Sequence, residues 1–197
     1  MTAAVVLAAG KARRMGTQKL LLPFAGRPMI VHIVDAILLA GVGPVFVVLP
    51  PQSGAVADAL AALPVTPVIN PDAEGDMLSS VRCGVRALPP ECHGFLLALG
   101  DQPGITAELI ERLMTAGKSS GKSLVVPACQ GRRGHPALIG IKHRQEVLTC
   151  HDGTGLRGLF HNHPDEIEEV AVDNPDTLRD ADLPEEYGRL CRVLPSP

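Results

Sequence analysis

Short apolar segments recur along this chain, and segments with helical periodicity separate them. A strand that is apolar at nearly every position is covered on both faces, which is typical of a parallel sheet between two layers of helices. The candidate strands are residues 3–9, 45–49, 65–69, 94–99, 123–127, 136–141 and 167–172. The candidate helices are residues 28–40, 53–63, 76–88 and 106–116, with weaker helices after residue 141. This alternation predicts an α/β fold with a mostly parallel, doubly wound sheet in a three-layer, Rossmann-like arrangement.

The size and charge of the chain limit its organisation and its partners. Its 197 residues contain no repeat, linker or charged block, so we expect one domain over residues 1–197. Eighteen Lys and Arg against 21 Asp and Glu give a net charge of −3, and 3% of the residues are aromatic. No nucleic-acid partner is expected, because such partners need basic surfaces or aromatic stacking platforms.

The apolar runs and the cysteine spacing bear on the cellular environment. No apolar run approaches the ~20 residues that span a bilayer, so we expect no membrane partner. The first residues do not resemble a secretory signal peptide. The five cysteines are never spaced as CxxC, which argues against a disulfide framework and against a zinc ribbon. Reduced thiols and a cytoplasmic location are the expectation.

Three familiar patterns occur in contexts that argue against their usual function. Residues 117–123 resemble a P-loop, but they have one residue too few between the glycines and precede a strand instead of following one. Residues 153–158 fit GxGxxG, but the preceding segment is polar and helix-like. His161 and His163 form an HxH pattern without a third ligand at a suitable spacing. We expect a plain turn, no dinucleotide site and two solvent-exposed histidines.

A basic loop with two glycines follows the first predicted strand. Its glycines and cations are Gly10, Lys11, Arg13, Arg14, Gly16 and Lys19, and it contains no acidic residue. Backbone N–H groups and cations of this kind bind the phosphates of a nucleoside triphosphate. Ligands of doubly wound sheets bind beyond the carboxyl ends of the strands, where this loop is expected to lie. Charge and glycine content alone leave two interpretations open, a phosphate cradle or a flexible basic surface loop.

This loop and five later segments resemble the signature motifs of the MobA-like nucleotidyltransferases. The first match is LAAG at residues 7–10, followed by RMG at residues 14–16 and by Lys19. The later matches are residues 20–29 (LLLPFAGRPM), 70–71 (NP) with 75–81 (GDMLSSV), 99–103 (LGDQP), 134–136 (GHP) and 172–175 (VDNP). Together they extend over almost the whole chain.

The motifs also resemble one branch of that family. LAAG accompanies cytidine nucleotides in the family and LAGG accompanies guanosine nucleotides, and this chain has Ala9 at the distinguishing position. The GHP motif is typical of the molybdenum cofactor cytidylyltransferases. The resemblance implies a nucleotide-diphospho-sugar transferase-like fold. It also implies a reaction in which CTP and the terminal phosphate of molybdopterin are joined and pyrophosphate is released.

The implied reaction requires little acid–base chemistry. A phosphate oxygen of the acceptor attacks the α-phosphorus of CTP in line, and this oxygen is already anionic near pH 7. Catalysis is then positioning plus charge neutralisation. By resemblance, the catalytic residues are Arg14, Lys19 and Asp101. The two cations bind the triphosphate, and the carboxylate binds Mg²⁺.

The remaining site residues are also assigned by resemblance. The nucleotide-binding set is Leu7, Ala8, Ala9, Gly10, Arg14, Lys19, Asn70, Ser79 and Ser80. The acceptor-side set is Gly134, His135 and Pro136. Local sequence leaves a second interpretation for Ser79 and Ser80, namely capping at the start of the helix that follows Asp76. The loop at residues 152–157 is a candidate to close over the acceptor, without an assigned chemical role.

Two carboxylates are candidates for the metal site. Asp101 follows a buried apolar strand, and Asp173 follows another. If these strands are neighbours, both carboxylates can reach one Mg²⁺ between the phosphates, whereas the alternative for each is an ordinary turn or cap aspartate. The related enzymes often have a further Asp two residues before the position of Asp173, where this chain has Ala171.

The sequence leaves two other functions open. One is a transferase of the same fold that uses GTP or another acceptor, such as a sugar or alcohol phosphate. The other is a non-catalytic carrier that delivers the molybdenum cofactor to an oxidoreductase, and a molybdenum oxidoreductase is the candidate protein partner. The presence of Arg14, Lys19, Asp101 and Asp173 argues against the carrier, which does not need all four.

Overall fold

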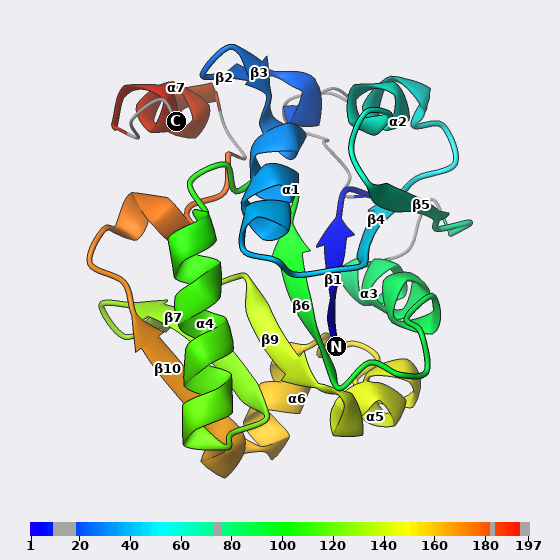
Figure 1. Cartoon of the computed structure of the whole chain (residues 1–197), viewed down its shortest axis with the longest axis vertical. Coiled ribbons are helices and arrows are strands. Elements are labelled where there is room, and N and C mark those ends of the chain that lie inside the picture. The colour runs from blue at the N-terminus through cyan, green and yellow to red at the C-terminus, as the bar shows by residue number, and fades with distance from the viewer. Residues whose placement is uncertain (10–18, 73–75, 182–183, 194–197) are drawn as a thin grey trace.

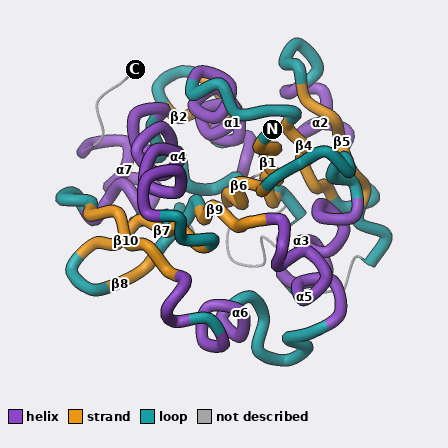
Figure 2. The backbone as a smooth tube through the Cα atoms, turned by 60° about the horizontal axis from the view of Figure 1, so that its bottom comes forward, coloured by secondary structure: helices purple, strands orange, loops and turns teal. Residues whose placement is uncertain are grey.

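The structure is a computed structural model that describes residues 1–9, 19–72, 76–181 and 184–193 (Figure 1). Within these residues an eight-stranded mixed sheet lies between two layers of helices, which Figure 2 shows from a second direction. The strands are β1 (Thr2–Leu7), β4 (Val45–Leu49), β5 (Val65–Ile69), β6 (Gly94–Leu99), β7 (Leu124–Cys129), β8 (Arg132–Arg133), β9 (Ala137–Gly140) and β10 (Ile167–Ala171). The helices are α1 (Met29–Leu39), α2 (Gly54–Leu60), α3 (Met77–Arg86), α4 (Ala107–Ser120), α5 (Arg144–Thr149), α6 (Arg157–Asn162) and α7 (Pro184–Val193).

The predicted α/β fold with a mostly parallel sheet is confirmed. The strand order is β10-β7-β9-β6-β1-β4-β5, and β8 pairs with the edge of β7. β1 is parallel to both of its neighbours, β4 and β6, with Leu7 opposite Val48 and Leu99. β9 is antiparallel to both β6 and β7. Only residues 130–136 connect β7 to β9, which is too short for a parallel crossover of about a dozen residues.

Successive side chains of the buried strands point to opposite faces of the sheet. In β1, Ala4 and Val6 pack into the core under α1, α2 and α4, whereas Ala3 and Val5 pack into the core under α3, α5 and α6. This double coverage explains why the strands are apolar at consecutive positions. α3 lies especially close to the sheet, because a Cβ at Gly84 would be 2.3 Å from Cγ1 of Val5.

Two helix ends differ from the predicted limits by three residues or more. α4 continues to Ser120, beyond the predicted end at residue 116, and it stops at Gly121, which has φ +68°. A positive φ is easily adopted by glycine and ends helices efficiently. The P-loop-like residues therefore form the last turn of α4 and the turn to β7, as their context predicted. α2 ends at Leu60, before the predicted limit at residue 63.

A hairpin and a helix outside the main sheet were not predicted. A short hairpin of β2 (Pro23–Phe24) and β3 (Arg27–Pro28) precedes α1, and α7 lies near the C-terminal end of the described chain. They pack together in a small separate core that contains Phe24, Met29, Ala181 and Leu190. This contact brings the C-terminal segment close to the residues that follow Lys19, where Tyr187 Oη donates to Pro23 O. Among the described residues, no helix has both the length and the apolar character that crossing a bilayer requires.

Candidate active site

Lys19 and Asp101 form an ion pair at the carboxyl edge of the sheet. Lys19 begins the short 3₁₀-helix η1 (Lys19–Leu21), and Asp101 is the second residue after β6. Lys19 Nζ lies 2.6 Å from Asp101 Oδ2, and the two side chains are only 11% and 19% exposed. Because the two charges are largely removed from water, their mutual attraction offsets part of the cost of burying each of them.

The turn that carries Asp101 is fixed against the end of β1. Gly100 N donates to Leu7 O over 2.9 Å, and a Cβ at Gly100 would be 2.6 Å from Cδ1 of Ile30. Glycine is therefore favoured at this close approach of the turn, β1 and α1, where a Cβ would also lie 3.1 Å from Leu7 O. The constraint places Asp101 directly beside the exit of β1, where the basic loop begins.

The predicted residues of the first loop are only partly described. Leu7 and Ala8 are buried at the end of β1, and Ala8 N donates to Val48 O over 2.9 Å. Ala9 is half-buried. Gly10 and Arg14 lie outside the described residues, so their predicted contacts with phosphates remain predictions.

Asn70 joins the end of β5 to the first turn of α3. Its buried amide donates to Ser79 Oγ and to Ser80 Oγ, each over 3.1 Å. Asp76 is the N-cap of α3, because its side chain accepts a hydrogen bond from Ser79 N over 2.9 Å. The cap is therefore Asp76, and the two serine hydroxyls form a polar cluster with Asn70 at the same edge of the sheet as Asp101.

Arg82, one turn further along α3, has a structural role in this arrangement. Its guanidinium donates to the carbonyl oxygens of Val147 and Cys150 and pairs with Asp152 over 2.7 Å. Arginine commonly binds the carbonyl groups that a helix leaves without partners at its C-terminal end. Arg82 thus ties α3 to the end of α5 and to the loop that follows.

The two predicted metal ligands do not follow neighbouring strands. β7 and β9 separate β6, which precedes Asp101, from β10, which precedes the exposed Asp173. The premise that adjacent strands bring the two carboxylates to one ion is therefore wrong. The shared Mg²⁺ site remains a prediction.

The chain after Asp173 returns across the sheet to Asp101. Ala181 N donates to Asp101 O over 3.1 Å. The buried Gln102 side chain donates to Leu178 O over 3.1 Å and to Asp180 Oδ1 over 2.6 Å. The chain after β10 therefore braces the turn of Asp101, a role that the sequence did not indicate for Gln102.

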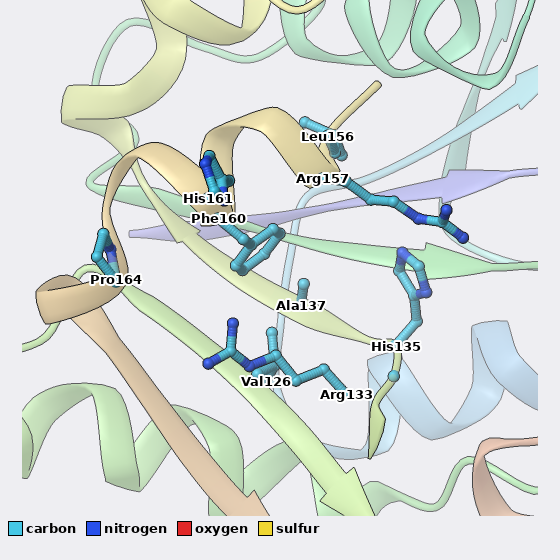
Figure 3. Close-up of a pocket in the computed structure, with 10 residues that line it drawn as sticks. Val126, Arg133, His135, Ala137, Leu156, Arg157, Phe160, His161 and Pro164 are labelled. Atoms are coloured by element: carbon cyan, nitrogen blue, oxygen red, sulfur yellow. The ribbon is translucent and has the colours of Figure 1, made fainter. Parts of the chain in front are cut away.

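A cavity of about 540 Å³ lies between the GHP segment and α6 (Figure 3). Its lining residues are Val126, Arg133, Gly134, His135, Ala137, Leu156, Arg157, Phe160, His161 and Pro164. Among the described residues, none of the lining side chains is acidic. The cavity thus combines an apolar wall with arginine and histidine side chains, which suits an anion that carries a flat ring.

His135 connects this cavity with the Lys19–Asp101 pair. Burial lowers the pKa of its imidazole below the ordinary value, and the nearby Asp101 carboxylate acts in the opposite direction. Figure 3 shows Arg157 extending from the start of α6 toward the His135 ring. A molecule in the cavity would therefore meet a neutral histidine and a permanent cation at the end nearest Asp101.

Sequence reasoning found only one wall of this cavity. Gly134 and His135 were predicted on the acceptor side, and both line it. Arg157 ends the loop at residues 152–157, which was a candidate cover for the acceptor. Arg133 and Phe160 were missed; Arg133 directly precedes the GHP motif, whereas the orientation of Phe160 depends on how α6 packs.

The structure also tests the two remaining sequence patterns. The GxGxxG segment forms the turn before α6 and the first two residues of that helix, and no strand leads into it, as its context predicted. His161 is exposed, as expected. The expectation is wrong for His163, whose Nε2 lies 2.7 Å from Glu146 Oε2 beside His143. The sequence could not reveal these partners because they come from another helix.

Comparisons with known proteins agree with the fold and with the motifs. The family model of the MobA-like NTP transferase domain matches residues 4–167. Nicotine blue oxidoreductase from Paenarthrobacter nicotinovorans is 32% identical over 194 residues, which cover 94% of each chain. The chain also matches bifunctional GlmU proteins, but it spans only about a third of the length of the one from Kineococcus radiotolerans.

Solved structures give the same result. The Rv0371c protein of Mycobacterium tuberculosis superposes with a TM-score of 0.85 at 28% identity, over 98% of both chains. A second structure of that protein, in complex with manganese, gives a TM-score of 0.81 at 25% identity over the same share. A nucleotidyl transferase from Methanothermobacter gives 0.84 at 27% identity, over 98% of this chain and 97% of the other.

Proposed function

As the chain belongs to the family of MobA-like NTP transferase domains, we propose that it transfers CMP from CTP to the terminal phosphate of a molybdopterin-type cofactor. The observation that carries the proposal is the Lys19–Asp101 pair beside a cavity without acidic lining residues in the described chain. The pair supplies a cation and a metal-binding carboxylate where a triphosphate would lie. The cavity supplies a cationic site for a phosphorylated, ring-containing acceptor.

The proposed step balances without an external base. An anionic phosphate oxygen of the acceptor attacks the α-phosphorus, and a new P–O–P linkage forms. The bond from the α-phosphorus to the bridging oxygen of the β-phosphate breaks, and pyrophosphate leaves with the electron pair. Lys19 neutralises charge that grows on the leaving group, as positioned cations do in phosphoryl transfer.

Asp101 is the first candidate ligand of a divalent ion. Its carboxylate is a hard oxygen donor of the kind that Mg²⁺ and Mn²⁺ bind, and Asp173 is the candidate second donor. A bound ion would neutralise phosphate charge and hold the triphosphate in one orientation. The manganese complex of the M. tuberculosis relative supports a divalent ion in this family. A bound ion would replace Lys19 as the partner of the Asp101 carboxylate.

The cavity supports an acceptor that is flat at one end and anionic at the other. Phe160 and Leu156 provide apolar surface against which a fused ring can stack. Arg157 provides bidentate donors for a phosphate, and His135 lies at the end nearest Asp101. Arg133 also lines the cavity, but its Nε is paired with Glu169 Oε1 over 2.7 Å. An acceptor bound with its ring against Phe160 and its phosphate near His135 would direct that phosphate toward the α-phosphorus of CTP.

The proposed preference for CTP rests on the residues at the carboxyl edge of the sheet that would face the base. Ala9 is half-buried, and its methyl group restricts the space available beside the base. The Asn70–Ser79–Ser80 cluster offers hydroxyl and amide groups to a ribose or a pyrimidine edge. A pyrimidine needs less room than a purine, so we favour CTP over GTP.

The name of the P. nicotinovorans relative supports a second candidate, an oxidoreductase. Two observations count against it for this chain. The GxGxxG segment lies before α6 and not between a strand and a helix, where a dinucleotide fingerprint is found. The Lys19–Asp101 pair suits phosphate chemistry and has no evident role in electron transfer.

Mass spectrometry of the product tests the proposal. The protein is incubated with Mg²⁺, molybdenum cofactor or molybdopterin, and CTP, GTP, ATP or UTP in parallel. We expect a CMP adduct of the pterin with CTP alone. A GMP adduct would overturn the nucleotide, and a cytidylyl adduct formed only with sugar or alcohol phosphates would overturn the acceptor. Tight cofactor binding without any adduct would favour the carrier, and consumption of nicotine blue with a reduced nicotinamide would favour the oxidoreductase.

A further inference from the structure

A second group of chemically active side chains lies at the opposite edge of the sheet from Asp101. His143 ends the 3₁₀-helix η2 (Ile141–His143), Glu146 is in the first turn of α5, and His163 follows α6. One ligand atom from each of these three side chains lies within 4.8 Å of the other two. Nothing in the proposed transfer reaction uses this cluster.

The donor atoms already face one another. Glu146 Oε2 lies 2.7 Å from His163 Nε2 and 3.9 Å from His143 Nδ1. Donors bound to one tetrahedral Zn²⁺ at ~2.0–2.1 Å are about 3.3 Å apart. Side-chain adjustments of about an ångström therefore bring the three atoms to bonding distance, while the backbone of α5 remains in place.

Hydrogen bonds around the cluster select the histidine nitrogen that would bind. Ser123 Oγ donates to Glu166, so it accepts from His143 Nε2, which lies 2.7 Å away. The proton on Nε2 leaves the lone pair of His143 on Nδ1, the atom that faces Glu146. Partners of this kind orient metal-binding histidines and increase their basicity.

The charge balance also suits a cation. Within the described chain, Glu146 pairs with histidines and Asn162 but with no lysine or arginine. His151 Nε2 and Asn162 Nδ2 bind the other oxygen, Oε1, over 2.9 and 3.4 Å. They leave Oε2 directed at His143 and His163. His143 is 4% exposed and His163 is 29% exposed, so one side of the cluster is open to solvent for a further ligand.

We propose that His143, Glu146 and His163 bind a divalent transition-metal ion, for which Zn²⁺ is the best-suited probe. Two imidazoles and one carboxylate are a common zinc ligand set, whereas Mg²⁺ prefers oxygen ligands alone. The ion would tie the start of α5 to the residues after α6. His163 lies between His161 and Pro164, which both line the acceptor cavity, so the ion would fix one wall of that cavity.

Isothermal titration of the tag-free protein with Zn²⁺ tests this site, which does not depend on the proposed transfer reaction. The Asp101→Asn variant serves as the background, because Asp101 is itself a candidate metal ligand. We expect one Zn²⁺ per chain. His163→Gln and, separately, His143→Gln should each weaken the affinity by about 100-fold or more, and Ser123→Ala should weaken it by about 10- to 100-fold. His161→Gln is the matched control from the same HxH pattern and should bind as the background protein does.

Two further readouts keep the test decisive if a variant is destabilised. Zn²⁺ should raise the melting temperature of the Asp101→Asn protein and leave that of its His163→Gln derivative unchanged. Co²⁺ in the same site should give the visible absorption of a four-coordinate ion, and His163→Gln should remove it. Absence of stoichiometric Zn²⁺ binding would overturn the proposal, and so would binding that survives both histidine substitutions.

Discussion

The backbone amide of Ala181 donates a hydrogen bond of 3.1 Å to the carbonyl oxygen of Asp101, although the two residues are far apart in the sequence. The bond holds the segment after β10 against the turn that carries Asp101, the candidate metal ligand. Gln102 reinforces it, because its buried amide binds Leu178 O and Asp180. The position of the Asp101 carboxylate thus depends on residues near the other end of the chain.

Replacement of Gln102 by Ala should therefore affect both stability and catalysis. The substitution leaves the Leu178 carbonyl without its amide partner, which we expect to cost about 1–3 kcal/mol in the free energy of unfolding. It should also lower kcat, since the Asp101 turn loses its brace. Urea denaturation and a pyrophosphate assay measure the two effects. Gln145→Ala, at an exposed position of α5, is the control, and equal behaviour of the two variants would contradict the bracing role.

The close packing of α3 gives a second prediction. A methyl group at Gly84 would meet Cγ1 of Val5 at 2.3 Å and Cγ2 of Val48 at 3.0 Å. Gly84→Ala should lower the free energy of unfolding by about 1–3 kcal/mol, because α3 must move away from the sheet. Gly54→Ala is the matched control, since its methyl group would have no neighbour within 4 Å. Urea denaturation measures the free energy of unfolding of both variants. A Gly84→Ala protein more stable than Gly54→Ala would contradict the close contact between α3 and the sheet.

A substitution in the cavity should weaken binding of the acceptor more than binding of CTP. Arg157→Gln should raise KM for the phosphorylated acceptor by about 10- to 100-fold, the value of one lost charge-assisted hydrogen bond. KM for CTP should change less, because Arg157 lines the cavity proposed for the acceptor. Steady-state kinetics with each substrate varied in turn measure the difference. Arg86→Gln, an exposed change on α3, is the control, and an equal rise in both KM values would argue against this role.

The acid stability of the protein should depend on Glu166. Bonds from Lys142 and from Ser123 lower the pKa of the Glu166 carboxyl from 4.5 to about 2. Since the pKa is lower in the folded state, the stabilisation is present above about pH 4.5 and is lost as the pH falls toward 2. The melting temperature of the wild type should fall more steeply over this range than that of Glu166→Gln.

The comparison of melting temperatures needs two controls. Chelator in the buffer removes any contribution from bound metal ions. Glu91→Gln, at an exposed position between α3 and β6, controls for the general loss of one negative charge. A Glu166→Gln profile as steep as that of the wild type would show that these bonds do not stabilise the fold.

The sequence predicted the sheet better than it predicted the site. Consecutive apolar residues such as those of β4 and β6 report burial on both faces, and this information is local. The antiparallel direction of β9 was missed, although the short connection from β7 already excluded a parallel crossover. The β2–β3 hairpin and α7 have weak local patterns and are fixed by their mutual contact.

The candidate site residues also divide into those indicated by local sequence and those that depend on contacts in the folded chain. The position of Asp101 at the carboxyl end of β6 could be predicted because its motif directly follows a buried apolar run, whereas its role at the site stays a prediction. The lining positions of Arg157 and Phe160 could not, because they depend on how α6 packs against β7 and β9. His163 was expected to be solvent-exposed because its partners, Glu146 and His143, approach it only in the folded chain. Arg14 belongs to the predicted site but lies outside the described residues.

The rate of acceptor-dependent pyrophosphate release tests the central claim most directly. The wild type is compared with Asp101→Asn and Lys19→Met, with CTP, Mg²⁺ and molybdenum cofactor present, and with Lys118→Met as an exposed control. The proposed function predicts release by the wild type that requires the acceptor and falls by about 10²- to 10³-fold in both site variants while Lys118→Met is unaffected. Wild-type rates in the two site variants, or release that does not require the acceptor, would contradict it.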